Sequence, residues 1–231
     1  MYRGLLPGRC WRKMNANRRL NFARTAGFPP DYFTHVRAEI KSLLHSHIDH
    51  CLEIGCGQGR TLEWIHAMTG ASVFGVELVE SEACKARSVA EVVVGNIESI
   101  ELPFAERSFD VILTLDLLEH LQDPWAIVRK LHLLLKPKGC LIASIPNVRH
   151  IAVLAPLVIA GQWTYRDCGL LDRTHLRFFT KRSATELLEC SGLKVDKIKA
   201  SRGRKSRALN IATLGLLHPL FDFQYLIRAI A

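Results

Sequence analysis

Gly55, Gly57 and Gly59 alternate with other residues in the stretch HCLEIGCGQGR, which spans residues 50–60. Apolar residues precede the glycines as in a short buried strand, and residues 61–68 after them have helical spacing. A strand, a glycine loop and a helix in this order can hold a nucleotide-like ligand over the backbone amides at the helix start. A side chain in the loop would block the tight turn or the approach of the ligand. A turn that only lets a helix pack on a strand would show the same glycines.

An acid follows the next apolar segment. Residues 72–76 predict a second strand, and Glu77 comes directly after it, roughly twenty positions beyond the glycine loop. A carboxylate at this position can accept hydrogen bonds from both hydroxyls of a ribose. Leu62 stands where a dinucleotide fingerprint has a further glycine. The pattern therefore favours a single nucleoside without a pyrophosphate.

These residues resemble the motifs of the class I S-adenosylmethionine (SAM)-dependent methyltransferases, of the methyltransferase-23 and methyltransferase-11 types. LEIGCGQG resembles their first motif, and "LPF…SFDVI" in residues 102–112 is common among them. The resemblance implies an α/β fold with a Rossmann-like, doubly wound, mostly parallel seven-stranded sheet, and SAM as the cofactor. Asn96 stands where the family usually has Asp, and its carbonyl oxygen can still accept a hydrogen bond from adenine. The cofactor contacts that the resemblance implies are Glu53, Gly55, Gly57, Gly59, Glu77, Leu78, Asn96, Ile97 and Asp116.

Residues 147–180 form a long insertion after the fifth predicted strand, and we expect them to form a substrate lid. The phrase GLLDRTHLRFFT within it resembles a segment of methyltransferase-23-type enzymes, many of which resemble tailoring enzymes for polysaccharides or sugar-bearing metabolites. An Asp-Leu-Leu-Glu-His sequence at residues 116–120 matches an "EH" pair of small-molecule methyltransferases. The arginines of the insertion could bind a carboxylate or phosphate, or be solvated. The substrate-binding candidates are Trp163, Tyr165, Arg166, Arg173, Arg177 and His120.

Histidines are the candidates for proton transfer. In methyl transfer from SAM the protein chiefly aligns the reactants and excludes water. A hydroxyl acceptor also benefits from a general base, a role that suits His at neutral pH. His175 is the first candidate, with Asp172 three residues before it to orient the ring or match its charge, and His150 is the second. His175 and Asp172 could equally be a structural pair that fixes the lid. The sequence shows no dedicated set of metal ligands.

The surrounding pattern predicts one domain. We expect a mobile basic arm in residues 1–30, whose composition also fits a mitochondrial presequence, and a SAM-binding domain in residues 31–200. An amphipathic helix over residues 32–44 precedes the first strand, and a strand near residues 193–198 is the sixth. The fifth strand is expected over residues 140–146, directly after Gly139, and Thr180 is the expected cap of the helix that ends near Cys190. Residues 201–231 combine a basic run with an apolar stretch in which no seventh strand can be placed.

The 231 residues carry a formal net charge of +9 and seven scattered cysteines. The charge favours an anionic partner, and the cysteine usage is typical of a reduced, cytoplasmic protein. No apolar run is long enough to span a membrane. Residues 202–231 fit either contact with anionic lipid at the inner face of a membrane or packing on the domain or on a second subunit.

The predicted activity is methylation, at oxygen, of a small-molecule, sugar or lipid-linked acceptor. An RNA methyltransferase is the alternative that the basic segments suggest. The residues Asp116-Leu117-Leu118 argue against it, because many base N-methyltransferases carry an Asn/Asp-Pro-Pro-aromatic box there. A non-catalytic SAM-binding module is a third hypothesis.

Overall fold

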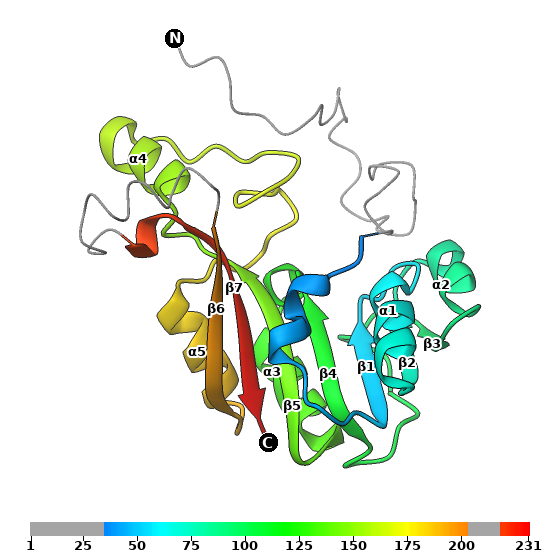
Figure 1. Ribbon diagram of the computed structural model, residues 1–231. Helices are drawn as coiled ribbons and strands as arrows, with labels where there is room; N and C mark the ends of the chain where they lie inside the picture. Colours follow the sequence, from blue (N-terminus) through cyan, green and yellow to red (C-terminus); the bar gives the residue numbers. More distant parts are fainter. Residues whose placement is uncertain (1–34, 203–217) are drawn as a thin grey trace.

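Seven strands form a single sheet in the order β3-β2-β1-β4-β5-β7-β6 (Figure 1). The structure is a computed structural model, and it describes residues 35–202 and 218–231. The strands from β3 to β5 in this order are paired parallel, and β7 is antiparallel to both β5 and β6. The elements are η1 (Ala38–Leu43), β1 (His50–Ile54), α1 (Arg60–Thr69), β2 (Ser72–Glu77), α2 (Glu80–Ala86), β3 (Glu91–Val94), β4 (Phe109–Leu115), η2 (Leu118–His120), α3 (Pro124–Leu134), β5 (Leu135–Pro146), α4 (Ile151–Ala160), α5 (Lys181–Glu189), β6 (Lys194–Arg202), η3 (His218–Leu220) and β7 (Asp222–Ile230). The predicted α/β, doubly wound fold is confirmed.

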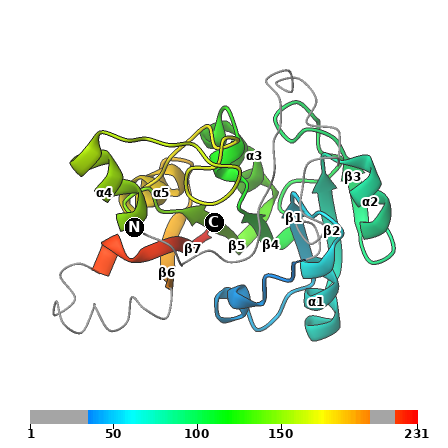
Figure 2. The same ribbon diagram turned by 90° about the horizontal axis from the view of Figure 1, so that it is seen from above.

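Helices cover both faces of the sheet (Figure 2). Leu131 of α3 and Leu187 of α5 are fully buried in the core on one face, whereas Ile40 of η1 and Ile65 of α1 are fully buried in the core on the other. The central strands read as nearly continuous apolar runs because their successive side chains enter opposite cores.

The chain reverses its direction across the sheet between β1 and β4. It runs outward from β1 to β2 and β3, then returns to place β4 on the other side of β1. In a parallel sheet, ligands bind in the crevice at the carboxyl ends of the strands where this reversal occurs. In Figure 1 the insertion with α4 lies above these carboxyl ends.

Strand β7 corrects the prediction for the C-terminal segment. No strand was expected in residues 201–231, for which packing on the domain was one alternative, but β7 pairs with β5 and β6 inside the sheet. Its alternation is hidden because the strand is buried on both faces from Tyr225 to Ala229. The one charge in this run, Arg228, is 8% exposed, forms an ion pair with Asp196 of β6 and donates to Leu43 O at 3.1 Å.

Other boundaries differ more modestly. The helix expected over residues 32–44 is the 3₁₀ helix η1 in its described part, and its first residues lie outside the described chain. Strand β5 begins at Leu135, directly after α3, rather than after Gly139. The helix start expected at Thr180 is confirmed by a capping box in which Thr180 Oγ1 accepts from Ser183 N at 3.2 Å.

The predicted basic arm of residues 1–30 and most of the basic run at 202–207 lie outside the described residues. Within the described ranges, no helix is long and apolar enough to cross a membrane.

Candidate active site

The glycine loop joins β1 to α1 in a left-handed backbone conformation. Gly55, Gly57 and Gly59 have φ angles of 77°, 54° and 76°. Non-glycine residues rarely adopt such angles. At Gly59, the N-cap of α1, an added Cβ would also lie 3.1 Å from side-chain atoms of Ala86 and Val89. Both the turn and the close packing therefore require glycine.

Glu77 closes this loop from the end of β2. Its side chain is 5% exposed, and its two carboxylate oxygens accept from Gly57 N at 2.7 Å and from Val79 N at 2.9 Å. Burial raises the pKa of Glu77, and the backbone N–H donors oppose that rise. The carboxylate of Glu77 therefore lies directly against the glycine loop, as the order of the motifs in the sequence suggested.

The end of β3 lies beside the end of β2, because Gly95 N donates to Glu77 O at 2.9 Å. Asn96 is exposed, and its Oδ1 accepts from Glu98 N at 3.0 Å. Ile97 is buried, and Leu78 is 40% exposed at the β2 end. Leu78, Asn96 and Ile97, which follow the ends of β2 and β3, form the outer rim of the loop, where the resemblance places a nucleoside.

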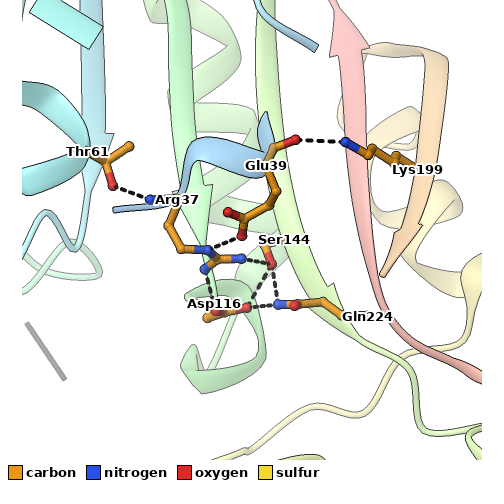
Figure 3. Close-up of polar contacts among 7 residues, drawn as sticks. All are labelled: Arg37, Glu39, Thr61, Asp116, Ser144, Lys199 and Gln224. Carbon is orange, nitrogen blue, oxygen red and sulfur yellow. Dashed lines mark hydrogen bonds and ion pairs between the residues drawn. The ribbon is translucent and has the colours of Figure 1, made fainter. Parts of the chain in front are cut away.

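Asp116 lies at the carboxyl end of β4 in a polar cluster shown in Figure 3. Its carboxylate accepts from Arg37 Nη1 at 2.5 Å and from Ser144 Oγ at 2.8 Å, and the Gln224 amide donates to it as well. Arg37 Nη2 also donates to Ser144 Oγ at 3.0 Å. The cluster joins residues from η1's N-terminal flank, β4, β5 and β7.

Arg37 was missed in the sequence analysis. It lies among the helically spaced apolar positions of residues 32–44, and only the fold brings it to the strand ends. A further link from this segment is the Arg37 N–H, which donates to Thr61 Oγ1 of α1 at 3.3 Å. The guanidinium side chain is 12% exposed and also contacts Glu39 Oε1 at 2.5 Å. A buried arginine held by two carboxylates is a fixed positive charge beside the glycine loop.

Glu53, in β1, is a buried carboxyl group that lacks a full set of partners. It is 4% exposed, and its Oε2 has no hydrogen-bond partner among the described residues. Burial raises its pKa to about 8, Arg37 opposes the rise and Glu77 adds to it. An orphaned buried acid close to these charges suits a cationic ligand.

The insertion contacts η2 through its second half. Leu176 N and Arg177 N donate to Glu119 O at 2.8 and 3.0 Å, and the rings of His120 and His175 lie 4.8 Å apart. One ligand atom from each of Glu119, His120 and His175 lies within 4.8 Å of the others. Glu119 was noted from the sequence only as part of the "EH" pair and was assigned no role.

Asp172 does not orient His175 in the way the sequence analysis expected. Its Oδ1 accepts from Thr174 N at 2.8 Å and from Thr174 Oγ1 at 2.6 Å, and the His175 ring instead bonds Leu170 O at 3.3 Å. Burial lowers the pKa of His175, and the Asp172 charge opposes that shift from a distance. Asp172 therefore shapes the turn that carries His175.

His150 stands apart from this group. It is the N-cap of α4, with Nδ1 accepting from Ala152 N at 3.2 Å, and its ring lies against Phe223 of β7 at 5.7 Å. The cap gives it a structural partner, and its catalytic role stays a prediction.

The aromatic residues of the insertion gather into one cluster, which includes Phe178 in addition to the predicted pair. The Trp163 ring lies 5.1 Å from Phe178 and 6.5 Å from Tyr165, which is 46% exposed. Of the predicted substrate arginines, Arg177 donates to Gln122 O and lies over the Trp125 ring. Arg173 forms an exposed pair with Asp167, and Arg166 is exposed.

Comparison with known proteins supports the fold and the interpretation of the sequence motifs. The model of the methyltransferase-23 family, described as "Methyltransferase domain", matches residues 19–198. The chain belongs to this family. The resemblance drawn from the sequence is thereby confirmed.

Two solved structures share the fold. One is a SAM-dependent methyltransferase from Archaeoglobus fulgidus, with a TM-score of 0.63 and 21% identity over 84% of this chain and 91% of the other. The second is a SAM-dependent methyltransferase from Mesorhizobium loti, with a TM-score of 0.60 and 18% identity over 84% of this chain and 96% of the other.

Curated relatives are more similar in sequence but match only in part. A protein of Coxiella burnetii (strain RSA 331 / Henzerling II) named "Ubiquinone biosynthesis O-methyltransferase" is 29% identical over 63% of this chain. A protein of the same name from Cereibacter sphaeroides (strain ATCC 17025 / ATH 2.4.3) is 32% identical over 62% of it. The matches span 64% and 59% of those relatives' own lengths.

Proposed function

We propose that the chain is a SAM-dependent methyltransferase that methylates a hydroxyl oxygen of a small-molecule acceptor. The observation that carries this proposal is the glycine loop closed by Glu77 with the orphaned Glu53 carboxyl beside it. SAM carries a ribose and a positively charged sulfonium and amino group, and these residues match both parts. The relatives named O-methyltransferases support oxygen as the acceptor atom.

The residues of this chain would hold SAM through separate groups. The loop amides at the start of α1 provide donors, and Glu77 at the end of β2 would accept from the ribose hydroxyls. Glu53 would face the positive end of the cofactor. Arg37, fixed by Asp116 at the ends of β4 and β5, would face the cofactor's carboxylate.

Asn96 and Ile97 would then contact adenine at the end of β3, with Leu78 on the other side of the ring. An amide oxygen at Asn96 can accept from the adenine amino group once it leaves its turn contact with Glu98. These assignments follow the family resemblance and the common position of the three residues on the loop rim.

When bound, SAM supplies a methyl group that its sulfonium activates for displacement. The acceptor's hydroxyl proton would have to leave to a nearby group. The protein aligns the two reactants and excludes water. His175 is the candidate site for removal of that proton, because the insertion places its ring 4.8 Å from that of His120, which follows the carboxyl end of β4.

The acceptor is proposed to contain a flat, apolar part. Trp163, Tyr165 and Phe178 form an aromatic cluster within two ring contacts of His175. Helix α4 adds exposed apolar side chains, with Val158 and Ile159 79% and 84% exposed. A lipid-linked acceptor would place its tail there.

Titration calorimetry with S-adenosylhomocysteine tests the cofactor assignment. Glu77→Gln is expected to weaken binding at least tenfold, because a neutral amide cannot accept from two ribose hydroxyls and two backbone N–H groups. Glu80→Gln, an exposed acid three residues later that pairs with Arg87, is the matched control and should bind like wild type. A folded wild-type protein that does not bind the ligand refutes the proposal.

A transfer assay tests the acceptor class. SAM with a labelled methyl group is incubated with catechol-type, glycosidic and prenylated phenolic acceptors. We expect label in the phenolic acceptors, with the prenylated ones used best, and transfer only to RNA would contradict the proposal.

A further inference from the structure

Glu119, His120 and His175 form a cluster of potential ligand atoms, and no described residue donates to the Glu119 carboxylate in it. Glu119 is 1% exposed, and neither of its carboxylate oxygens has a hydrogen-bond partner among the described residues. Leaving a buried carboxyl group unpaired is costly. The cluster joins η2, at the end of β4, to the turn in the insertion that carries His175, which is 9% exposed.

Both imidazoles are oriented by backbone carbonyls. His120 Nδ1 lies 3.2 Å from Thr174 O, and His175 Nδ1 lies 3.3 Å from Leu170 O. Because a carbonyl oxygen only accepts, each Nδ1 carries the proton and each Nε2 keeps its lone pair. Metal-binding histidines are oriented in this way, with the second ring nitrogen donating to a carbonyl or carboxylate.

The positive charge of Arg37 acts on Glu119, where it opposes the effect of burial. Burial lowers the pKa of both His120 and His175, and burial together with Asp116 raises the pKa of Glu119. Neutral imidazoles and an ionised carboxylate are the forms of these side chains that bind a cation.

The ligand atoms are close enough for one ion. They lie within 4.8 Å of one another, and ligands about 2.0–2.1 Å from a tetrahedral zinc ion lie roughly 3.4 Å apart. The side chains would close by roughly 1.4 Å at most, which rotations about their χ angles can supply. Two histidines and one carboxylate are a ligand set of zinc sites that keep a further position open.

We propose that Glu119, His120 and His175 bind a divalent transition-metal ion of the zinc type. The ion ties the insertion to the end of β4 and leaves one coordination position toward the acceptor side. This deepens, and for its role rests on, the proposed function: the acceptor hydroxyl would bind the ion, which lowers the pKa of the hydroxyl, and would release its proton to solvent, so that His175 serves as a ligand and not as the base. Binding of the ion itself requires neither SAM nor acceptor.

The test is metal binding by the full chain after treatment with a chelator. Calorimetry with ZnCl₂ is expected to show one tight site per chain in the wild type, and Zn²⁺ at a hundredfold excess over its Kd should raise the melting temperature by about 5–10 °C. Substitution with Co²⁺ should give the visible absorption bands of a four-coordinate centre with nitrogen and oxygen ligands.

Three variants locate the site. Glu119→Gln and His175→Gln should each weaken zinc binding at least a hundredfold. His132→Gln should leave it unchanged, since His132 also bonds a backbone carbonyl (Ser191 O, 3.0 Å) but lies outside the cluster. Tight binding that survives both cluster substitutions, as exposed cysteines could produce, overturns the proposal, and so does a wild-type chain that binds no zinc.

Titration with S-adenosylhomocysteine serves as the control for folding. Loss of zinc binding in a cluster variant is evidence for the site only if the variant is folded, which binding of this ligand shows. If the wild type itself does not bind the ligand, a cooperative melting transition like that of the wild type without metal shows it instead. The two proposals therefore fail separately: zinc binding without cofactor binding refutes only the proposed function, and cofactor binding without zinc binding refutes only the metal site.

Discussion

Replacing Glu53 with Gln should make the ligand-free protein more stable at alkaline pH. Burial raises the pKa of Glu53 to about 8 in the folded chain, against an ordinary value of 4.5. The folded state therefore holds a proton on this group that the unfolded state has lost. Stability falls as the pH rises from about 4.5, and the loss levels off above the folded-state pKa near 8. Gln cannot titrate and does not contribute to this loss.

The size of the effect follows from the two pKa values. With 4.5 in the unfolded and about 8 in the folded state, Glu53 destabilises the fold by about 1.4 kcal/mol at pH 5.5 and by about 4.6 kcal/mol at pH 8.5. The stability of Glu53→Gln relative to wild type should therefore increase by about 3 kcal/mol between these pH values. Any fixed cost of burying the amide cancels in this difference.

Urea denaturation at pH 5.5 and 8.5, without cofactor, measures this change in the relative stability of Glu53→Gln. Glu63→Gln on α1, whose carboxylate is 48% exposed and pairs with Arg60, is the control for loss of an exposed carboxylate. A relative stability of Glu53→Gln that stays constant within about 0.5 kcal/mol refutes the argument, because Glu53 would then be ionised and solvated in the folded protein. The variant should also bind S-adenosylhomocysteine more weakly, since it lacks the charge that faces the amino group.

Two further substitutions test the loop and the residue that the sequence analysis missed. Gly59→Ala should lower the free energy of unfolding by about 2–4 kcal/mol in urea denaturation, because it adds crowding against Ala86 and Val89 to the strain of a positive φ. The control Gly70→Ala, with φ of 74° and no atom within 4 Å of its Cβ, should lower it only by the strain of about 1–2 kcal/mol. Equal losses would show that crowding is unimportant. Arg37→Gln should weaken S-adenosylhomocysteine binding at least tenfold, with Arg60→Gln on α1 unchanged as the control, and equal affinities for the two variants would remove Arg37 from the cofactor site.

The features that the sequence predicted are those that local spacing encodes. The glycine loop, Glu77 after β2 and the Thr180 cap each depend on residues a few positions apart, or on one strand and the next along the chain. The strands of the parallel part were predicted for the same reason, since each is a short apolar run bounded by turn residues.

The features that escaped prediction depend on long-range contacts. Arg37 lies 79 positions from Asp116, and His175 lies 55 or 56 positions from its partners in the cluster, so only the fold shows that they meet. Glu119 looked like one half of a familiar "EH" pair until its burial and missing partners were visible. Strand β7 lacks alternation because α5 packs on one of its faces and η1 lies against the other.

The position of β7 bears on how the protein is made. Residues 222–230 emerge from the ribosome after every other described element, yet they fill the gap between β5 and β6 in the sheet. Until then β5 presents an unpaired edge and β6 has no partner in the sheet, a state exposed to wrong pairing with other chains. Gln224, which arrives with β7, also completes the cluster around Asp116. The same strand thus closes the sheet and completes its ligand-binding edge.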